Sequence, residues 1–157
     1  MNKHITIGWQ EWVSLPNLMI PAIKVKVDTG AKTSSIHAEN IEHFYKDGVE
    51  YIRFDVLPLE KKSSIIVHCE APFVEKRQVK SSNGEKEHRP IVLTTLKVGE
   101  LEWEIELNLT NRKYMTRYML LGRNSMVGKV MINPGEKFLL GNLDKGQIKS
   151  LYAPKAK

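Results

Sequence analysis

Val27-Asp28-Thr29-Gly30-Ala31 is the stretch of sequence that decides the fold, and residues 23–27 alternate between apolar and basic side chains. This period of two is typical of a half-buried strand, so we expect Asp28 on a tight loop at a strand end. Gly30 permits backbone angles closed to other residues, Thr29 offers a hydroxyl group to a neighbouring loop, and Asp28 presents two oxygens. Asp-x-Gly turns are common in β proteins, so this tripeptide alone predicts no function.

A second segment, Met119-Leu120-Leu121-Gly122-Arg123-Asn124, lies about ninety residues further along the chain. Its apolar residues predict a strand that ends in a glycine, and Gly122 would let another backbone approach closely. Asn is a favoured N-cap residue, so Asn124 predicts one short helix over residues 125–129, before Pro134-Gly135 intervenes.

Strand patterns dominate the rest of the chain. Between residues 101 and 109 every odd position is apolar and every even position is polar, and residues 51–56 alternate in the same way. Asp47-Gly48 and Asn83-Gly84 each lie between two strand-like segments and predict hairpin turns. Helical periodicity is poor throughout. The sequence therefore predicts an all-β fold with one short helix after Asn124.

The two segments together resemble the retropepsin family of aspartic peptidases, in which an Asp-Thr-Gly-Ala loop and a later Gly-Arg-Asn segment interlock. More narrowly, residues 27–35, 80–90 and 120–124 resemble a bacterial group labelled ATP-dependent zinc proteases, which is often associated with RimK-type glutamate ligases. The resemblance covers about residues 7–140, and the combined motifs are more specific than any one of them. It implies a closed β-barrel in which the hairpin around Asn83-Gly84 forms a flap.

The resemblance also implies roles for individual residues. The expected catalytic residues are Asp28, Thr29 and Gly30. The residues expected to support the site are Ala31, Leu121, Gly122, Arg123 and Asn124. Positive charge near the site, rather than the resemblance, makes Lys32, Arg77, Lys80 and Arg89 the residues expected to bind substrate. An aspartic peptidase needs two carboxylates that share one proton, and the chain has one Asp-Thr-Gly, so the resemblance implies a homodimer with one Asp28 from each copy.

Lys32 is a departure from viral retropepsins, which carry at this position a second aspartate that pairs with the arginine of Gly-Arg-Asn. Arg123 therefore needs another partner, which the sequence does not identify. The expected flap, residues 75–89, carries six basic side chains against three glutamates. A cationic lid favours acidic peptide substrates. An equally good interpretation is that these residues only keep the hairpin soluble and protect a strand edge.

Composition favours one soluble domain. The chain has 157 residues, of which 41% are hydrophobic, which is enough for one core. We expect a peptidase domain over residues 1–145 and a Lys-rich tail over residues 146–157 that is partly disordered. No apolar run approaches the ~20 residues of a membrane-spanning helix, and the N-terminus has no secretory pattern. The expected location is therefore cytoplasmic, without membrane contact.

Nucleic acid, metals and cofactors are not expected partners. The net charge is +6, but basic and acidic residues are interleaved and no recognition motif accompanies them. His37 and His43 would lie too far apart on a strand for one metal ion, and His68 and Cys69 would point to opposite faces. No phosphate-binding loop is present, which argues against ATP use by this chain.

Two functions stay open at this point. The first is an aspartic endopeptidase that hydrolyses acidic peptides through Asp28 of both copies of a homodimer. The second is a catalytically silent retropepsin-like module that binds a peptide or a partner and is associated with a glutamate-ligase system. Lys32 and the single Asp-Thr-Gly keep the second function open, and the oligomeric state would separate the two.

Overall fold

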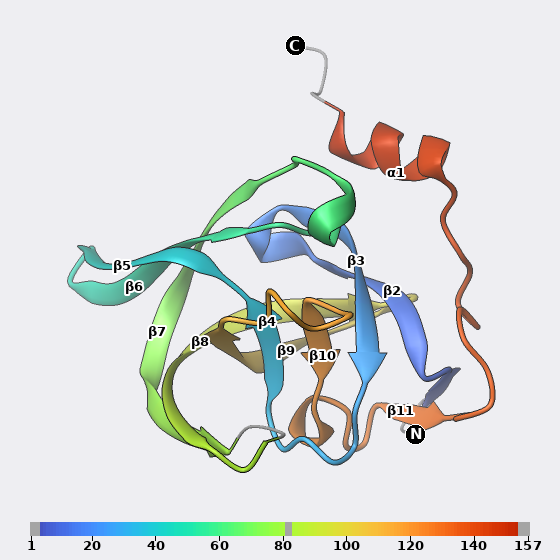
Figure 1. Ribbon diagram of the computed structural model, residues 1–157, viewed down its shortest axis with the longest axis horizontal. Coiled ribbons are helices and arrows are strands. Elements are labelled where there is room, and N and C mark those ends of the chain that lie inside the picture. Colours follow the sequence, from blue (N-terminus) through green and yellow to red (C-terminus); the bar gives the residue numbers. More distant parts are fainter. Residues whose placement is uncertain (1–3, 81–82, 154–157) are drawn as a thin grey trace.

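The computed structural model describes residues 4–80 and 83–153, and strands make up most of its regular structure (Figure 1). One sheet has nine strands in the order β2-β3-β10-β4-β9-β8-β7-β6-β5. These strands are β2 (Gln10–Leu15), β3 (Ile20–Val27), β4 (Ser34–His37), β5 (Glu39–Lys46), β6 (Val49–Val56), β7 (Val67–Lys80), β8 (Lys86–Val98), β9 (Leu101–Thr110) and β10 (Met119–Leu121). A separate parallel pair consists of β1 (Ile5–Ile7) and β11 (Val130–Ile132). The mostly β fold predicted from the sequence is confirmed.

Alternating side chains account for the central strands, because each strand buries the apolar half of its pattern. In β6, Ile52, Phe54 and Val56 are buried, as the alternation predicts. β9 covers the whole predicted strand, and its Leu107 and Leu109 lie in the same core cluster. The predicted strand before Asp28 is the C-terminal half of β3.

Both predicted hairpins are present. Asp47 and Gly48 join β5 to β6, and both have positive φ angles, 52° and 79°, as a type I′ turn requires. Asn83-Gly84 lies in the turn between β7 and β8, which pair along most of their length. Ser81 and Ser82 of this turn lie outside the described residues. Figure 1 shows the turn beside the loop that follows β3.

The helix predicted over residues 125–129 is wrong. A single 3₁₀ turn, η3 (Arg123–Ser125), occupies its start, and the Asn124 side chain does not cap it. The N–H groups of Met126 and Val127, which a cap at Asn124 would serve, donate instead to the Arg123 carbonyl at 3.0 and 3.2 Å. Gly128, with a φ angle of 77°, then turns the chain into β11. The other 3₁₀ turns are η1 (Pro16–Leu18) and η2 (Glu60–Lys62).

The α-helix lies near the C-terminus instead. α1 (Lys145–Tyr152) begins with a capping box in which Asp144 and Gln147 exchange side-chain and backbone hydrogen bonds. Its Tyr152 hydroxyl donates to the carbonyl of Ala22 in β3. The part of the predicted disordered tail that is described is therefore helical, whereas residues 154–157 lie outside the described residues. The domain boundary at residue 145 stays a prediction.

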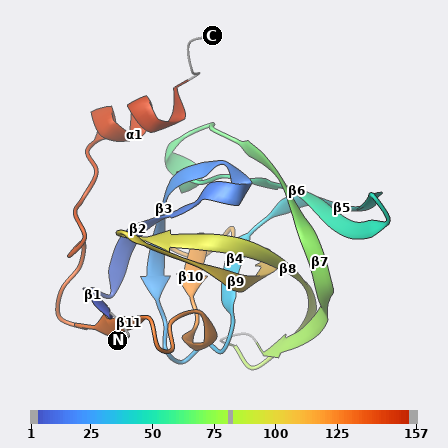
Figure 2. The ribbon, with the colours of Figure 1, turned by 180° about the vertical axis from the view of Figure 1, so that it is seen from behind.

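Closure of the sheet into a barrel also stays a prediction. β2 pairs with β3 along its length and meets β8 at one further residue pair, Ser14 and Lys97. Figure 2, seen from behind, shows β8 and β9 crossing in front of β4 and β10. Among the described residues, no helix has the length and apolar character needed to cross a membrane.

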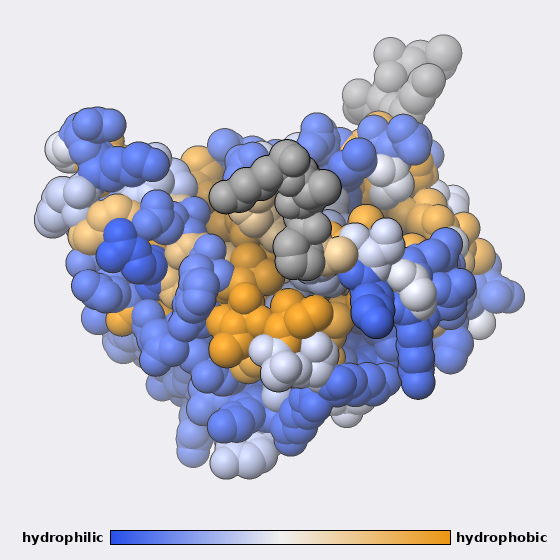
Figure 3. Space-filling view, turned by 90° about the horizontal axis from the view of Figure 1, so that it is seen from above, coloured by the Kyte–Doolittle hydropathy of each residue, from blue (hydrophilic) through white to orange (hydrophobic). Residues whose placement is uncertain are grey.

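Part of the apolar surface lies outside the core. Figure 3 shows apolar side chains gathered in the middle of the face seen from above, with hydrophilic residues around them. Met19, Ile66 and Leu151 are among the large apolar side chains of the chain that are exposed. Within residues 4–80 and 83–153, nothing covers them.

Cys69 should be chemically inert in the folded protein. It is 2% exposed, and burial raises the pKa of its thiol to about 12. At pH 8 we expect its reaction with a thiol reagent such as DTNB to be at least about a thousandfold slower than in the unfolded chain, because the thiolate is the reactive form. Absorbance of the released thionitrobenzoate, followed with and without guanidinium chloride, measures both rates. Equal rates would contradict the burial of this side chain.

Candidate active site

Asp28 occupies the first position after β3, and backbone hydrogen bonds fix it there. Its N–H donates to the Leu121 carbonyl at 2.9 Å. Its Oδ1 accepts the Gly30 N–H at 3.1 Å, so one side of the carboxylate is held by the loop itself. The side chain is half-buried and lines a cleft. Asp28 is therefore a fixed carboxylate that a ligand in the cleft can reach.

The two predicted segments interlock as the sequence indicates. β10 lies between β3, to which it is parallel, and β4, to which it is antiparallel. At its end, Gly122 packs so closely that a Cβ atom would lie 2.5 Å from the Thr33 carbonyl carbon. The Gly122 N–H donates to Ser34 Oγ at 3.0 Å, and Ser34 Oγ lies 2.6 Å from Ser125 Oγ. A side chain at residue 122 would separate these loops.

The structure identifies the partner of Arg123. Its Nη1 donates to the Thr29 carbonyl at 2.8 Å, and its backbone N–H donates to the Ala31 carbonyl at 2.7 Å. A backbone oxygen thus takes the place of the second aspartate that Lys32 replaces. The Thr29 side chain is exposed and has no hydrogen bond within the described part of the chain. It is available to a group outside this chain.

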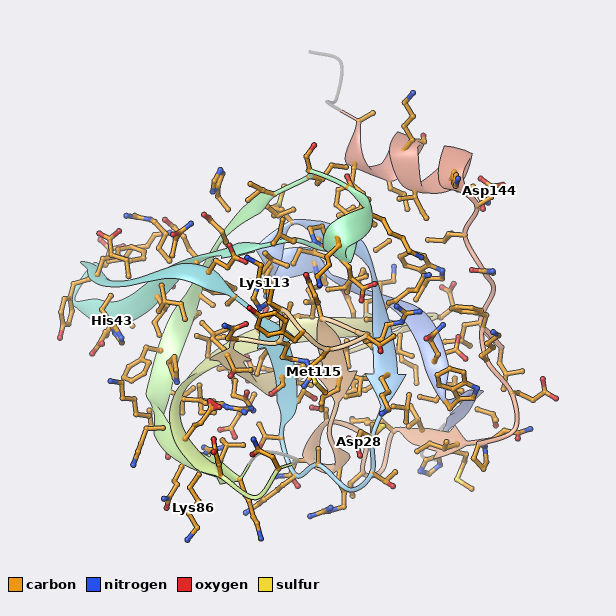
Figure 4. All side chains as sticks on the ribbon, in the orientation of Figure 1. Asp28, His43, Lys86, Lys113, Met115 and Asp144 are labelled. Carbon is orange, nitrogen blue, oxygen red and sulfur yellow. The ribbon has the colours of Figure 1, made fainter. Side chains whose placement is uncertain are left out.

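A cleft of about 1060 Å³ opens beside Asp28, between the loop after β3, the β7–β8 hairpin and the loop that joins β9 to β10. Figure 4 shows Asp28 at the end of β3 and Met115 on the β9–β10 loop. The four cationic residues predicted to bind substrate all line this cleft: Lys32, Arg77, Lys80 and Arg89. Six of the lining side chains are cationic and two are carboxylates, so the cleft is positively charged.

The two arginines of the hairpin are bound to other side chains. Arg77 Nη1 donates to Glu106 at 2.8 Å. Arg89 is 9% exposed, and its Nη1 donates to Ser35 Oγ and Asn108 Oδ1, both at 3.2 Å. Both side chains therefore shape the wall of the cleft.

The two lysines predicted to bind substrate, unlike the two arginines, are not held by other described side chains. Lys32 and Lys80 are exposed, and neither forms an ion pair with another described residue. An ammonium group on a long flexible stem can follow a ligand. Of the predicted substrate-binding residues, these two are the freest to contact an anion.

Sequence reasoning missed Arg112. It is buried in the β9–β10 loop and lines the cleft. Its N–H donates to His37 Nδ1 at 2.9 Å, and its Nε and Nη2 both donate to the Arg117 carbonyl at 3.2 Å. Burial lowers the pKa of Arg112, the nearby Arg89 lowers it further, and Asp28 acts in the opposite direction. No sequence motif marks a single arginine in a polar loop, so only the fold reveals it.

A family model described as "Retropepsin-like aspartic endopeptidase RimB" matches residues 6–142. The chain belongs to this family. The matched residues include those that line the cleft and both interlocking segments, so the similarity to the RimB-like family extends over the whole candidate site.

Segments similar to this RimB-like chain occur in proteins of two lengths. The chain is 44% identical over 154 residues to a "Probable alpha-L-glutamate ligase" of Shewanella pealeana and 45% identical over 154 residues to one of Parasynechococcus marenigrum. Each match covers 98% of this chain and 33% of the relative, so the chain spans about a third of their length. A crystal structure of a protein of unknown function from Legionella pneumophila has a TM-score of 0.72 and 31% identity, and the match covers 88% of this chain and 99% of that one.

Three of the five histidines of this RimB-like chain each pair with a different carboxylate. His37 contacts Glu39, His43 contacts Glu50, and His68 contacts Asp55, each at 2.6 Å. Within residues 4–80 and 83–153, no three His, Cys, Asp or Glu side chains gather in a group that could hold a metal ion. The carboxylates that line the cleft, among the described residues, are Asp28 and Glu87.

Proposed function

We propose that this chain is an aspartic endopeptidase that acts as a homodimer, with Asp28 of each copy forming the catalytic dyad. The observation that carries the proposal is the interlock of the Asp28 loop with Gly122 and Arg123. This interlock holds Asp28 rigidly at the edge of a large cleft. Membership of the family described as retropepsin-like aspartic endopeptidases supports it.

The proposed mechanism follows from two carboxylates at close range. Like charges so close cannot both ionise, so the pair shares one proton. The ionised carboxylate takes a proton from a water molecule, whose oxygen attacks the peptide carbonyl carbon, and the protonated carboxylate donates to the developing oxyanion. As the C–N bond breaks, the carboxylate that took the water proton passes it to the leaving amine, and the other carboxylate takes its proton back from the oxygen of the intermediate. Thr29, whose hydroxyl has no described partner, would brace the two loops across the two-fold axis.

The charge of the cleft supports an acidic peptide as the substrate. Six cationic side chains face two carboxylates there, and electrostatic focusing in a cleft concentrates ligands of opposite charge. The β7–β8 hairpin would close over the bound peptide as a flap. We also propose that β2 and β8 close the sheet into a barrel, and that the protein works in the cytoplasm.

A second candidate is a catalytically silent module that serves a glutamate ligase. Its support is that relatives named as glutamate ligases contain a segment similar to this whole chain within a protein about three times as long. Under this proposal the cleft binds a peptide or the ligase without cleaving it. An association with RimK-type ligases fits either candidate.

Asp28→Asn tests the peptidase. Incubated with a peptide library derived from a proteome, the wild type should cleave and the variant should cleave at least about a thousandfold more slowly, because one essential acid–base group is lost. Asp47→Asn is the matched control, since Asp47 is exposed in the β5–β6 turn and does not line the cleft, so this variant should leave the rate unchanged. Mass spectrometry of the products measures both.

Mixing the wild type with the Asp28→Asn variant tests separately whether two Asp28 residues form one active site. If each active dimer needs two Asp28 residues, an equimolar mixture that has exchanged subunits should retain about a quarter of the activity rather than half. Analytical ultracentrifugation should show the dimer. Cleavage undiminished by Asp28→Asn would eliminate the aspartic mechanism, and a folded dimer that cleaves nothing would favour the silent module.

A further inference from the structure

Arg112 is a buried cation without an acidic partner. Four other arginines of the chain each lie within ion-pair distance of a glutamate: Arg53, Arg77, Arg89 and Arg117. No such pair involves Arg112 within the described residues, although Arg112 is only 9% exposed. Burying an uncompensated charge is costly. A folded domain keeps such a group when something else supplies the opposite charge.

The guanidinium of Arg112 has unused donors that open into the cleft. A guanidinium carries five N–H donors, and the Arg117 carbonyl accepts from Nε and Nη2. Among the described residues, the fully buried side-chain atoms without a hydrogen bond are Thr94 Oγ1 and Asn108 Nδ2. Nη1 of Arg112 is therefore not sealed inside the protein. Because Arg112 lines the cleft, its free donors face the space where a ligand would bind.

The position of Arg112 is fixed before any ligand arrives. His37 is 2% exposed, accepts the Arg112 N–H at Nδ1 and contacts Glu39 through Nε2. The carbonyl that holds the guanidinium belongs to Arg117, whose own side chain donates to Gln10. A group held in this way loses little conformational entropy when it binds a ligand.

The surroundings of Arg112 select a carboxylate. Arg89 and Asp28 both lie close enough to act on the charge of Arg112, which Arg89 disfavours and Asp28 favours. Two neighbouring guanidinium groups attract a planar anion, and a guanidinium binds carboxylates through two parallel hydrogen bonds. Arg89 already has Glu87 at 3.2 Å, so the group left without a counterion is Arg112.

We propose that Arg112, with Arg89 beside it, is a carboxylate-binding subsite next to Asp28 that selects substrates. This proposal rests on the proposed function, because the bound carboxylate belongs to the peptide substrate in the cleft. The carboxylate is either an acidic side chain of that peptide or its C-terminus, and the chemistry of recognition is the same for both.

Binding to the Asp28→Asn variant tests the subsite without any need for turnover. Three labelled peptides are compared by fluorescence anisotropy. The first has glutamates and an amidated C-terminus, the second has glutamines and an amidated C-terminus, and the third has glutamines and a free C-terminus. Adding Arg112→Gln should weaken binding of at least one carboxylate-bearing peptide about tenfold or more, because a charge-assisted hydrogen-bonded pair is lost. It should leave the wholly neutral peptide unchanged.

The peptide that loses affinity identifies the source of the carboxylate. A loss confined to the glutamate peptide assigns the subsite to an acidic side chain, and a loss confined to the free C-terminus assigns it to the terminal carboxylate. Arg53→Gln is the control, because Arg53 pairs with Glu70 on exposed surface outside the cleft. Arg112→Lys keeps the positive charge but not the paired N–H donors of the guanidinium, so it should bind with intermediate affinity. It also checks that the loop still folds.

Three results would overturn the subsite: an equal loss for neutral and acidic peptides, no loss at all, or no binding of any carboxylate-bearing peptide. These outcomes are independent of the peptidase assay. An inactive wild type that still shows the carboxylate-specific loss would remove the proposed catalysis and keep the subsite. An active enzyme whose peptide affinity is unchanged by Arg112→Gln would keep the proposed catalysis and remove the subsite.

Discussion

Gly122→Ala is expected to lower the free energy of unfolding by about 3 kcal/mol or more, because overpacking costs most where neither side can move. The added Cβ atom would lie 2.5 Å from the Thr33 carbonyl carbon and 2.8 Å from the Ser34 nitrogen. Both are backbone atoms, so no side-chain rotation relieves the contact. Separating the loops would also break the hydrogen bond from the Gly122 N–H to Ser34 Oγ.

Gly135→Ala is the matched control for this substitution. The nearest atom to its added Cβ is Asn133 Oδ1 at 3.6 Å, an ordinary contact, and its φ angle is not in the left-handed region. Urea unfolding followed by fluorescence should show a large loss for Gly122→Ala and less than about 1 kcal/mol for Gly135→Ala. Equal stabilities for the two variants would mean that the loops are not in contact at residue 122.

Glu11→Ala should destabilise the fold by about 3–5 kcal/mol, because it leaves three backbone donors without partners. Glu11 is fully buried, and its carboxylate accepts the N–H groups of Gly8 at 2.7 Å, Leu139 at 2.9 Å and Leu140 at 3.2 Å. It thereby fastens the segment after β11 to the start of β2. Gly8 supports the same crossing, since a Cβ there would lie 2.2 Å from the Glu136 carbonyl oxygen.

Glu100→Ala removes the same carboxylate from an exposed position in the β8–β9 turn and should change stability by less than about 0.5 kcal/mol. Glu11→Gln should lie between the two, because its amide can accept some of the three hydrogen bonds. Hydrogen exchange provides a second measurement, since the amides of Leu139 and Leu140 should exchange faster in Glu11→Ala. Unchanged exchange and stability would show that water replaces the carboxylate.

Sequence patterns correctly predicted the features that depend only on neighbouring residues. The alternation at residues 101–109 and the Asp47-Gly48 turn depend on one strand or one turn, and both are confirmed. The close approach at Gly122 was predicted because only a glycine fits it, and the family resemblance brought in the loop that it meets. The helix expected after Asn124 is absent, and the N–H groups of Met126 and Val127 that an Asn124 cap would serve donate to the Arg123 carbonyl.

The remaining features depend on contacts between distant parts of the chain. The interaction of Arg123 with the Thr29 carbonyl cannot be seen in a sequence, since backbone oxygens are the same at every residue. Arg112 has no pattern around it, and its burial results from packing against β4 and the β9–β10 loop. α1 could have been found, because Asp144 and Gln147 have the spacing of a capping box, but the lysines around it resemble a disordered tail.

The place of β10 between β3 and β4 also fixes the order in which the protein is completed. The two strands that flank the Asp28 loop are near in sequence but are joined only through residues 119–121, which are made much later on the ribosome. A nascent chain that ends before these residues has the Asp28 loop without its scaffold. Under the proposed function, a catalytic centre built in this way would stay unassembled until residues 119–121 have been made, which would protect the growing chain and its neighbours from cleavage.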